Sequence, residues 1–218
     1  MRSFGVPVEA AAGPQPVDHS RSRRRTSAAI KRVLARILVR RHSQPAVIHA
    51  TAVLRDGTPV HLRAIRPDDK ERLRIAFERL SPRSVYRRFF HPVTALTPAM
   101  LRQLTELDFR NHVGLVLSVE DEAGERLIAV ARFVRVACRR DRAEFAITVA
   151  DDYQNRGAAT LLLQQLVRIA RGGGVRELVA EILEDNREML ELIRRSKLPC
   201  RQTFEDGVCR VVVSLLED

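Results

Sequence analysis

The stretch from residue 143 to residue 174 constrains the fold most, because its hydrophobic period changes across one short polar turn. In AEFAITVA the residues Phe145, Ile147 and Val149 face one way and their neighbours the other, as in a half-buried strand. After DDYQNRG comes the leucine-rich run AATLLLQQLVRIARGGG, whose terminal glycines suit a helix C-cap. The stretch therefore predicts a strand, a glycine-hinged turn and a helix.

The segments on either side extend this unit into a mixed sheet. LRDGTPVHLRAI predicts a hairpin turn followed by a strand, with Val60, Leu62 and Ala64 on one face. Proline in the first turn marks three helical segments: RPDDKERLRIAFERL, SPRSVYRRFF and TPAMLRQLTELD. The later segments predict a hairpin, a strand, a helix and a closing hairpin: VGLVLSVEDEAGERLIAVARFVRVA, RELVAEIL, NREMLELIRRS and CRQTFEDGVCRVVVSLLE. The overall order, β, α, α, β, β, β, α, β, α, β, β, predicts an α/β (α+β) domain with helices flanking a mixed central sheet.

The positive charge of the chain is concentrated before residue 49. Residues 1–48 hold 10 Lys and Arg against 2 Asp and Glu, which is +8 of the net +11. Residues 1–20 are rich in Ala, Pro and Gly and are predicted to be disordered. RSRRRTSAAIKRVLARILVRRH is predicted to form a basic amphipathic helix. We therefore expect an N-terminal extension over 1–48 and one domain over 49–218.

Several partners fit such a basic helix. It has the charge to contact an anionic membrane surface, nucleic acid without sequence preference, or the chain's own domain. Its arginine-rich, acid-poor composition also suits a transit peptide. The simplest alternative is a tail that becomes ordered only on contact. The nearly balanced charge of residues 49–218 favours no nucleic-acid partner for the domain itself.

The three cysteines, Cys138, Cys200 and Cys209, are odd in number and widely spaced. Without a CxxC pair or a Cys/His ligand spacing, we expect neither a disulfide framework nor a zinc site, and no other metal. Reduced thiols favour a cytoplasmic location. No apolar stretch approaches the roughly 18 residues that a membrane-spanning helix needs.

The turn at residues 151–157 has the chemistry of an anion site. A helix N-terminus leaves backbone N–H groups unpaired and carries partial positive charge, so that it binds anions without a lysine. Gly157 permits a tight turn and a close approach of the backbone to a ligand, and Arg156 adds a cation. Neither GxxxxGK[ST] nor GxGxxG is present, which argues against a P-loop or a dinucleotide fold. An ordinary strand-to-helix connection and a phosphate cradle both remain open on this local chemistry.

The turn resembles the cofactor loop of a known superfamily. Residues 154–159, QNRGAA, fit the Q/R-x-x-G-x-G/A signature of the GNAT acyl-CoA N-acyltransferases, and the resemblance extends over roughly residues 53–218. It implies the GNAT fold, acetyl-CoA as the acetyl donor, and a loop whose backbone amides hold the coenzyme A pyrophosphate. The residues it implies for cofactor binding are Val149, Gln154, Asn155, Arg156, Gly157, Ala158, Ala159, Thr160 and Asn186.

Other segments narrow the resemblance. LRDGTPVHLRAIRPDD, RLSPRSVYRRFF, VARFVR and AEFAITVADDYQNRG are similar to the GNAT domain of Pat-type bacterial protein lysine acetyltransferases. This implies acetyl transfer to a protein lysine ε-amine. A small-molecule amine acceptor, or a catalytically weak acyl-CoA sensor that serves as an interaction module, is the alternative. We expect no control by cyclic nucleotide, because the chain has no room for the domain that binds it in those enzymes. The oligomeric state is left open.

Glu144 is the candidate general base. A lysine with a pKa of ~10.4 is only about 0.04% neutral at pH 7, so a base must remove its proton, directly or through water. Glu144 begins the strand that leads into the loop, and it matches the catalytic glutamate of the Pat-type AE-x-A segment. The alternative is a strand-edge glutamate that pairs with Arg132 or Arg142.

The general acid of many GNAT enzymes is missing. They protonate the departing thiolate with a tyrosine seven residues after the motif asparagine, where this chain has Ile193. Water would suffice, because a thiol with a pKa near ~8.5 is an undemanding leaving group. Asp151 and Asp152, just before the turn, are expected to be solvated or capping groups.

Overall fold

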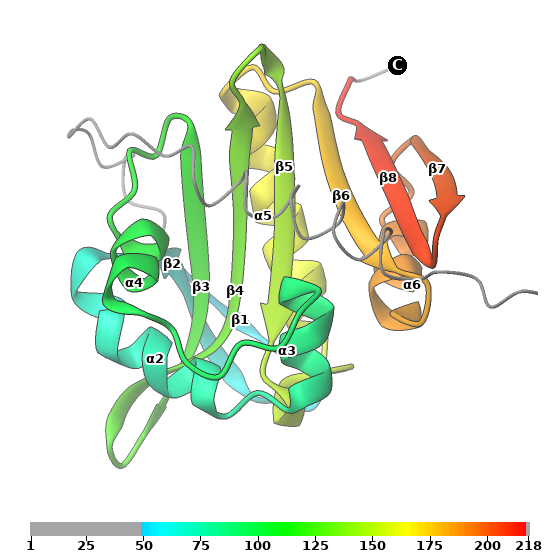
Figure 1. Cartoon of the computed structure of the whole chain (residues 1–218). Coiled ribbons are helices and arrows are strands. Elements are labelled where there is room, and N and C mark those ends of the chain that lie inside the picture. Colours follow the sequence, from blue (N-terminus) through cyan, green and yellow to red (C-terminus); the bar gives the residue numbers. More distant parts are fainter. Residues whose placement is uncertain (1–48, 217–218) are drawn as a thin grey trace, which may run out of the picture.

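The computed structural model describes residues 49–216, which form one eight-stranded sheet flanked by helices on both faces (Figure 1). The predicted basic helix lies outside the described residues. The strands are ordered β1-β2-β3-β4-β5-β6-β8-β7 across the sheet, and every neighbouring pair is antiparallel except β5 and β6. Their bounds are β1 His49–Val53, β2 Pro59–Ala64, β3 His112–Asp121, β4 Gly124–Val136, β5 Arg139–Val149, β6 Glu177–Leu183, β7 Cys200–Glu205 and β8 Val208–Ser214. The predicted mixed, mostly antiparallel sheet is confirmed.

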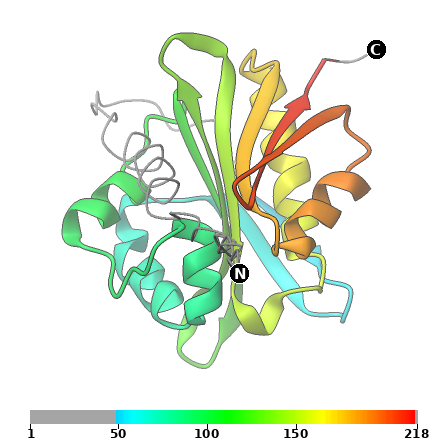
Figure 2. The same cartoon turned by 45° about the vertical axis from the view of Figure 1, so that its right-hand side comes forward.

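The helices form two layers. One face of the sheet carries α2 (Lys70–Glu78), α3 (Pro82–Phe89) and α4 (Pro98–Thr105) (Figure 1). The other face carries α5 (Ala158–Gly172) and α6 (Arg187–Arg195), as the turned view also shows (Figure 2). Two short 3-10 helices, η1 (Pro67–Asp69) and η2 (Asp151–Tyr153), precede α2 and α5.

The predicted helix starts of α3 and α4 are confirmed at their caps. The Ser81 hydroxyl accepts a hydrogen bond from the Ser84 N–H, and the Thr97 hydroxyl accepts one from the Met100 N–H. In each helix the next residue is proline, which lacks the N–H that would go unpaired there. Short polar side chains therefore determine where both helices begin.

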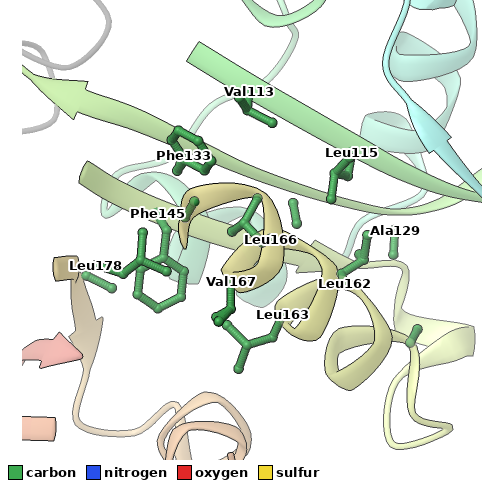
Figure 3. Close-up of a cluster of buried hydrophobic side chains, with 14 of the residues drawn as sticks. Val113, Leu115, Ala129, Phe133, Phe145, Leu162, Leu163, Leu166, Val167 and Leu178 are labelled. Carbon is green, nitrogen blue, oxygen red and sulfur yellow. The ribbon is translucent and has the colours of Figure 1, made fainter. Parts of the chain in front are cut away.

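The main core lies between α5 and the central strands (Figure 3). Leu162 and Leu166 of α5 are fully buried against the alternating face of β5 that Phe145 represents. This agrees with the change of hydrophobic period in the sequence, because both elements direct one apolar face to the same layer. A second core joins α2, α3 and α4 to the opposite face of β3 and β4.

The predicted order of elements lacked one strand and one helix. The first is β1, an edge strand whose side chains are mostly exposed, so that HATAV has no apolar alternation to mark it. The second is one of the three helices α2, α3 and α4. A start signal marks each of them in the sequence, but the predicted order counts only two helices at this place. The closing hairpin is confirmed: Asp206 and Gly207 join β7 to β8 with positive φ angles.

The two parallel strands separate after a short common segment. Residues 142–144 of β5 pair with residues 177–179 of β6, and no further pairs follow. The carboxyl ends of the two strands then diverge, that of β5 toward α3 and that of β6 toward α6 (Figure 1). This divergence leaves backbone and side chains of β5 accessible between the strands.

Candidate functional site

A cavity of about 460 Å³ lies where β5 and β6 separate. Its walls come from the end of β5, the loop after η2, the first turn of α5, and parts of α3 and α6. The chain thus brings the predicted strand–turn–helix unit together with two helices distant in sequence.

The loop before α5 is held in an unusual backbone conformation. Gly157 is the N-cap of α5 with φ 98°, and Asn155 has φ 60°. The Arg55 N–H donates to the Arg156 carbonyl over 2.9 Å, which ties the loop to the β1–β2 turn. The first helical hydrogen bond runs from the Leu161 N–H to the Gly157 carbonyl. The N–H groups of residues 157–160 therefore have no partner within the helix, and because these residues line the cavity, the N–H groups are available to a ligand.

Eight of the nine predicted cofactor-binding residues line this cavity: Val149, Gln154, Asn155, Gly157, Ala158, Ala159, Thr160 and Asn186. The exception is Arg156. Its guanidinium lies 2.7 Å from the Asp56 carboxylate and stacks over the Tyr153 ring at 5.1 Å. Arg156 therefore fastens the loop to the β1–β2 turn.

Two of these side chains also support the local structure. Gln154 Nε2 donates to the Val149 carbonyl over 3.3 Å and to the Ser84 hydroxyl over 3.2 Å. Asn186 Oδ1 accepts from the Met189 N–H and caps α6. Asp151, expected to be a solvated or capping group, is exposed, and its carboxylate accepts from the Ser81 N–H and from the hydroxyls of Ser81 and Ser84, which ties η2 to the start of α3.

Arginines dominate the charged lining of the cavity. Arg55, Arg87, Arg88, Arg187 and Arg195 stand against Glu188 and Glu191. Arg87 is bonded to Glu188 over 3.0 Å, and Arg195 to Glu191 over 2.5 Å. No local pattern in the sequence marks Arg55 or Arg187 as part of this site, because they reach the cavity from the β1–β2 turn and from α6, which are distant from the loop in the chain. The excess positive charge favours an anionic ligand.

Glu144 lies in an adjoining cavity of about 180 Å³, which shares Arg87, Asn186 and Met189 with the first. Its side chain projects from β5 on the face away from α5 and remains accessible to solvent in the opening between the strands. The surrounding protein still limits its hydration. This partial burial, and then the Glu181 carboxylate, raise the pKa of Glu144 against the opposing effect of Arg210.

The alternative pairing of Glu144 is not observed. Arg142 bonds Glu177 over 2.5 Å. Arg132 contacts the Leu104 carbonyl and His112, and within residues 49–216 neither arginine forms an ion pair with Glu144. The carboxylate is therefore available to a ligand.

The position of the missing tyrosine belongs to the hydrophobic core. Ile193 is 1% exposed and packs in the main core. Tyr153, next to the loop, accepts a hydrogen bond from Arg126 over 3.1 Å and lies between the guanidiniums of Arg126 and Arg156. Ile193 is thus part of the core, and Tyr153 is held in place by two arginines.

Residues 49–216 contain no group of three or more His, Cys, Asp or Glu side chains placed to hold a metal ion. None of their helices has the length and apolar character needed to cross a membrane. All three cysteines are free thiols.

Comparison with known proteins identifies relatives of the whole domain. The family model for the acetyltransferase (GNAT) domain matches residues 60–198. The chain is 33% identical over 144 residues to an acetyltransferase of Pseudomonas aeruginosa, covering 66% of this chain and 77% of that protein. It is 37% identical over 142 residues to acetyltransferase Pat of Mycolicibacterium smegmatis, covering 65% of this chain and 42% of Pat.

Among solved structures, the GNAT domain of S. lividans PAT is similar, with a TM-score of 0.72 and 35% identity over 79% of this chain and 99% of that one. The family match covers more than half of the chain. The chain therefore belongs to the GNAT family of acetyl-CoA-dependent N-acetyltransferases.

Proposed function

We propose that this enzyme transfers the acetyl group of acetyl-CoA directly to a protein lysine ε-amine, with Glu144 as the general base. The observation that carries the proposal is the placement of Glu144 beside the cavity that the loop before α5 forms: its carboxylate has no ion-pair partner within residues 49–216, and its pKa is raised. The likeness to Pat-type acetyltransferases supports lysine as the acceptor.

The lining of the larger cavity fits coenzyme A. The first turn of α5 offers backbone N–H groups and the positive end of a helix, and Gly157 leaves no Cβ beside them. We propose that Val149, Gln154, Asn155, Gly157, Ala158, Ala159, Thr160 and Asn186 contact the coenzyme, and that Arg156 acts by holding the loop.

The reaction follows from these positions. Glu144 removes a proton from the ammonium group, directly or through water, and the neutral nitrogen attacks the thioester carbonyl carbon. The C–S bond then breaks, the acetyl group stays on nitrogen, and the nitrogen gives up its second proton to water, which can pass it to the departing thiolate. A raised pKa suits this base, because a carboxylate closer in pKa to the working pH accepts the proton more readily. Water protonates the thiolate, since Ile193 occupies the position of the tyrosine acid.

A small-molecule amine is the second candidate acceptor. The cavity beside Glu144, about 180 Å³ in volume, has room for a few-carbon amine. Incubation with acetyl-CoA and a panel of proteins and small amines, read by mass spectrometry, separates the two. Acetylated lysines support the proposal, and turnover of small amines alone overturns the lysine assignment. Tight binding of coenzyme A without any turnover would indicate an acyl-CoA sensor.

We further propose that the domain begins near residue 49, where β1 starts, and that residues 1–48 form a separate basic extension. If the extension binds nucleic acid, its deletion removes a binding that weakens steeply with salt. If it contacts its own domain, deletion changes the kinetics of acetyl transfer.

Gly157→Ala is expected to weaken acetyl-CoA binding about tenfold. Gly157 has φ 98°, and a residue with a Cβ costs about 1–2 kcal/mol in a left-handed conformation, so the loop would relax away from the ligand. Gly174→Ala is the matched control: Gly174 has φ 79° and lies outside the cavity lining. Both variants should melt at lower temperature, and only Gly157→Ala should raise the Kd measured by calorimetry. Equal Kd values for acetyl-CoA in the two variants would contradict a role of the loop around Gly157 in binding the coenzyme.

The rate should depend on pH through Glu144 and its two charged neighbours. Because the pKa of Glu144 is raised, kcat/KM should fall on acidification at a pH above the ordinary glutamate range. Glu181→Gln removes a like charge and should move this inflection to lower pH. Arg210→Gln removes an opposite charge and should move it to higher pH. Shifts of both variants in one direction would contradict the assignment of Glu144.

A further inference from the structure

Arg132, which is buried, and Arg88, which is partly buried, lie beside the face of the sheet that carries Glu144. Arg132 of β4 is 7% exposed, and Arg88 projects from α3 toward the same cavity. In the β4–β5 register Arg132 is opposite Ala146, and the next pair on that face is Val134 with Glu144. Arg132 and Glu144 therefore occupy successive positions on one sheet face and line the same cavity.

Neither arginine has an anionic partner within residues 49–216. Both contacts of Arg132 use Nη1: the Leu104 carbonyl at 3.4 Å and His112 Nε2 at 3.4 Å. Arg88 stacks over the Phe89 ring at 5.1 Å. The remaining guanidinium N–H groups of Arg132 have no protein acceptor in the described part of the chain.

The neighbouring groups do not neutralise this pair. Burial, and then Arg132, lower the pKa of His112 to about 3, so this histidine is neutral. Its Nδ1 has no hydrogen-bond partner within residues 49–216. The Asp108 carboxylate is already engaged by the backbone N–H groups of Arg110, Asn111 and His112. Burial, and then Arg88, lower the pKa of Arg132 to about 9. Two cations thus share a poorly hydrated site, which is costly without an anion.

The arginines face open space. Both line the cavity of about 180 Å³ that contains Glu144, and both line a smaller, mostly apolar cavity of about 60 Å³ beneath α2 and α3. A carboxylate on a short carbon chain would place its charge between the guanidiniums and its methylene groups against apolar walls. Planar guanidiniums match the two oxygens of a carboxylate.

We propose that Arg88 and Arg132 form a carboxylate-binding subsite beside Glu144, so that this enzyme uses a substrate bearing a carboxylate. The carboxylate belongs either to the acyl chain of a donor that the enzyme uses besides acetyl-CoA or to the acceptor, close to the amine that is acylated. This inference rests on the proposed function, since it places the subsite next to the reacting thioester.

The donor form is tested with two stable thioethers that differ in charge, S-(2-carboxyethyl)-coenzyme A and S-butyl-coenzyme A. By calorimetry the wild-type enzyme should bind the charged thioether about tenfold more tightly or better. Arg132→Met should remove this preference, and Arg88→Met should reduce it. Arg210→Gln, which removes an exposed arginine from the same cavity, should retain it.

The acceptor form is tested on the enzyme saturated with coenzyme A, by titration with β-alanine and with propylamine. A preference for β-alanine that Arg132→Met removes assigns the carboxylate to the acceptor. A charge preference in either titration supports the subsite, and its absence in both overturns it. If Arg132→Met does not fold, the comparison of the two thioethers and that of the two amines on the wild-type enzyme still test the subsite. Failure of both thioethers to bind would instead contradict the coenzyme A cavity of the proposed function.

Discussion

Glu144→Gln is expected to lower kcat/KM for acetyl transfer by about 10²–10⁴-fold, the usual contribution of a general base. The amide keeps the size and the hydrogen-bonding reach of the carboxylate but cannot accept a proton at neutral pH. Glu144 lines the smaller cavity and not the one around the loop, so the Kd for acetyl-CoA should change little. Steady-state kinetics and calorimetry on the same preparation measure both quantities.

Stability separates this catalytic role from a structural one. The folded-state pKa of Glu144 is raised, so its ionised form weakens the fold at neutral pH, and this effect disappears as pH falls below the ordinary glutamate value. Glu144→Gln should therefore be at least as stable as the wild type at pH 7, with the difference vanishing in acid. Denaturant unfolding at several pH values measures it.

Glu177→Gln is the matched control for this prediction. Glu177 starts β6, within the short segment that pairs with β5, and its carboxylate bonds Arg142 over 2.5 Å. Its amide variant should keep the rate and lose some stability. A large rate loss in Glu177→Gln would mean that the rate depends on the pairing of β5 with β6. Normal turnover in Glu144→Gln would mean that Glu144 is not the general base.

The parts of the site that are local in sequence could be predicted. The strand, the turn and the helix between residues 143 and 174 follow from hydrophobic period and glycine placement, and residues within this unit keep their relative positions in the fold. The caps at Ser81 and Thr97 are equally local, because a side chain there bonds a backbone group three residues away.

The electrostatic surroundings of the site could not be predicted in this way. Glu181 and Arg210, which act on the pKa of Glu144, come from β6 and β8, and their proximity depends on a strand order that no local pattern specifies. Arg55 reaches the loop from the β1–β2 turn for the same reason. Charged residues at such positions look in the sequence like ordinary surface residues.

A buried ion pair was hidden inside a correctly recognised helix start. In RPDDKERLRIAFERL the proline of the first turn predicts a helix start and nothing about a buried ion pair. In the structure Asp69 is fully buried and accepts from both terminal nitrogens of Arg63, each over 2.7 Å. It also accepts from the Arg66 N–H over 2.8 Å. Arg63 in turn bonds Glu125 of β4, so the network joins β2, η1 and β4.

Asp69→Asn is expected to destabilise the fold by about 3 kcal/mol, at the lower end of the cost of removing one partner from a buried ion pair. The variant leaves the Arg63 guanidinium, 3% exposed, with Glu125 as its remaining anion. Chemical denaturation of the wild type and the variant measures the loss. Glu71→Gln is the control, because Glu71 and its partner Arg74 are both exposed on α2, and its unfolding midpoint should stay unchanged.

Replacement of both partners distinguishes net stabilisation from structural specificity. If the pair stabilises the fold by itself, Arg63→Met combined with Asp69→Leu should be as unstable as Asp69→Asn. If the penalty in Asp69→Asn comes from an uncompensated buried cation, the double variant should regain most of the lost stability, since apolar residues of similar size carry no desolvation cost. We expect the second result only in part, because Glu125, whose pKa the hydrogen bond from Arg63 lowers to about 2, would lose its main partner.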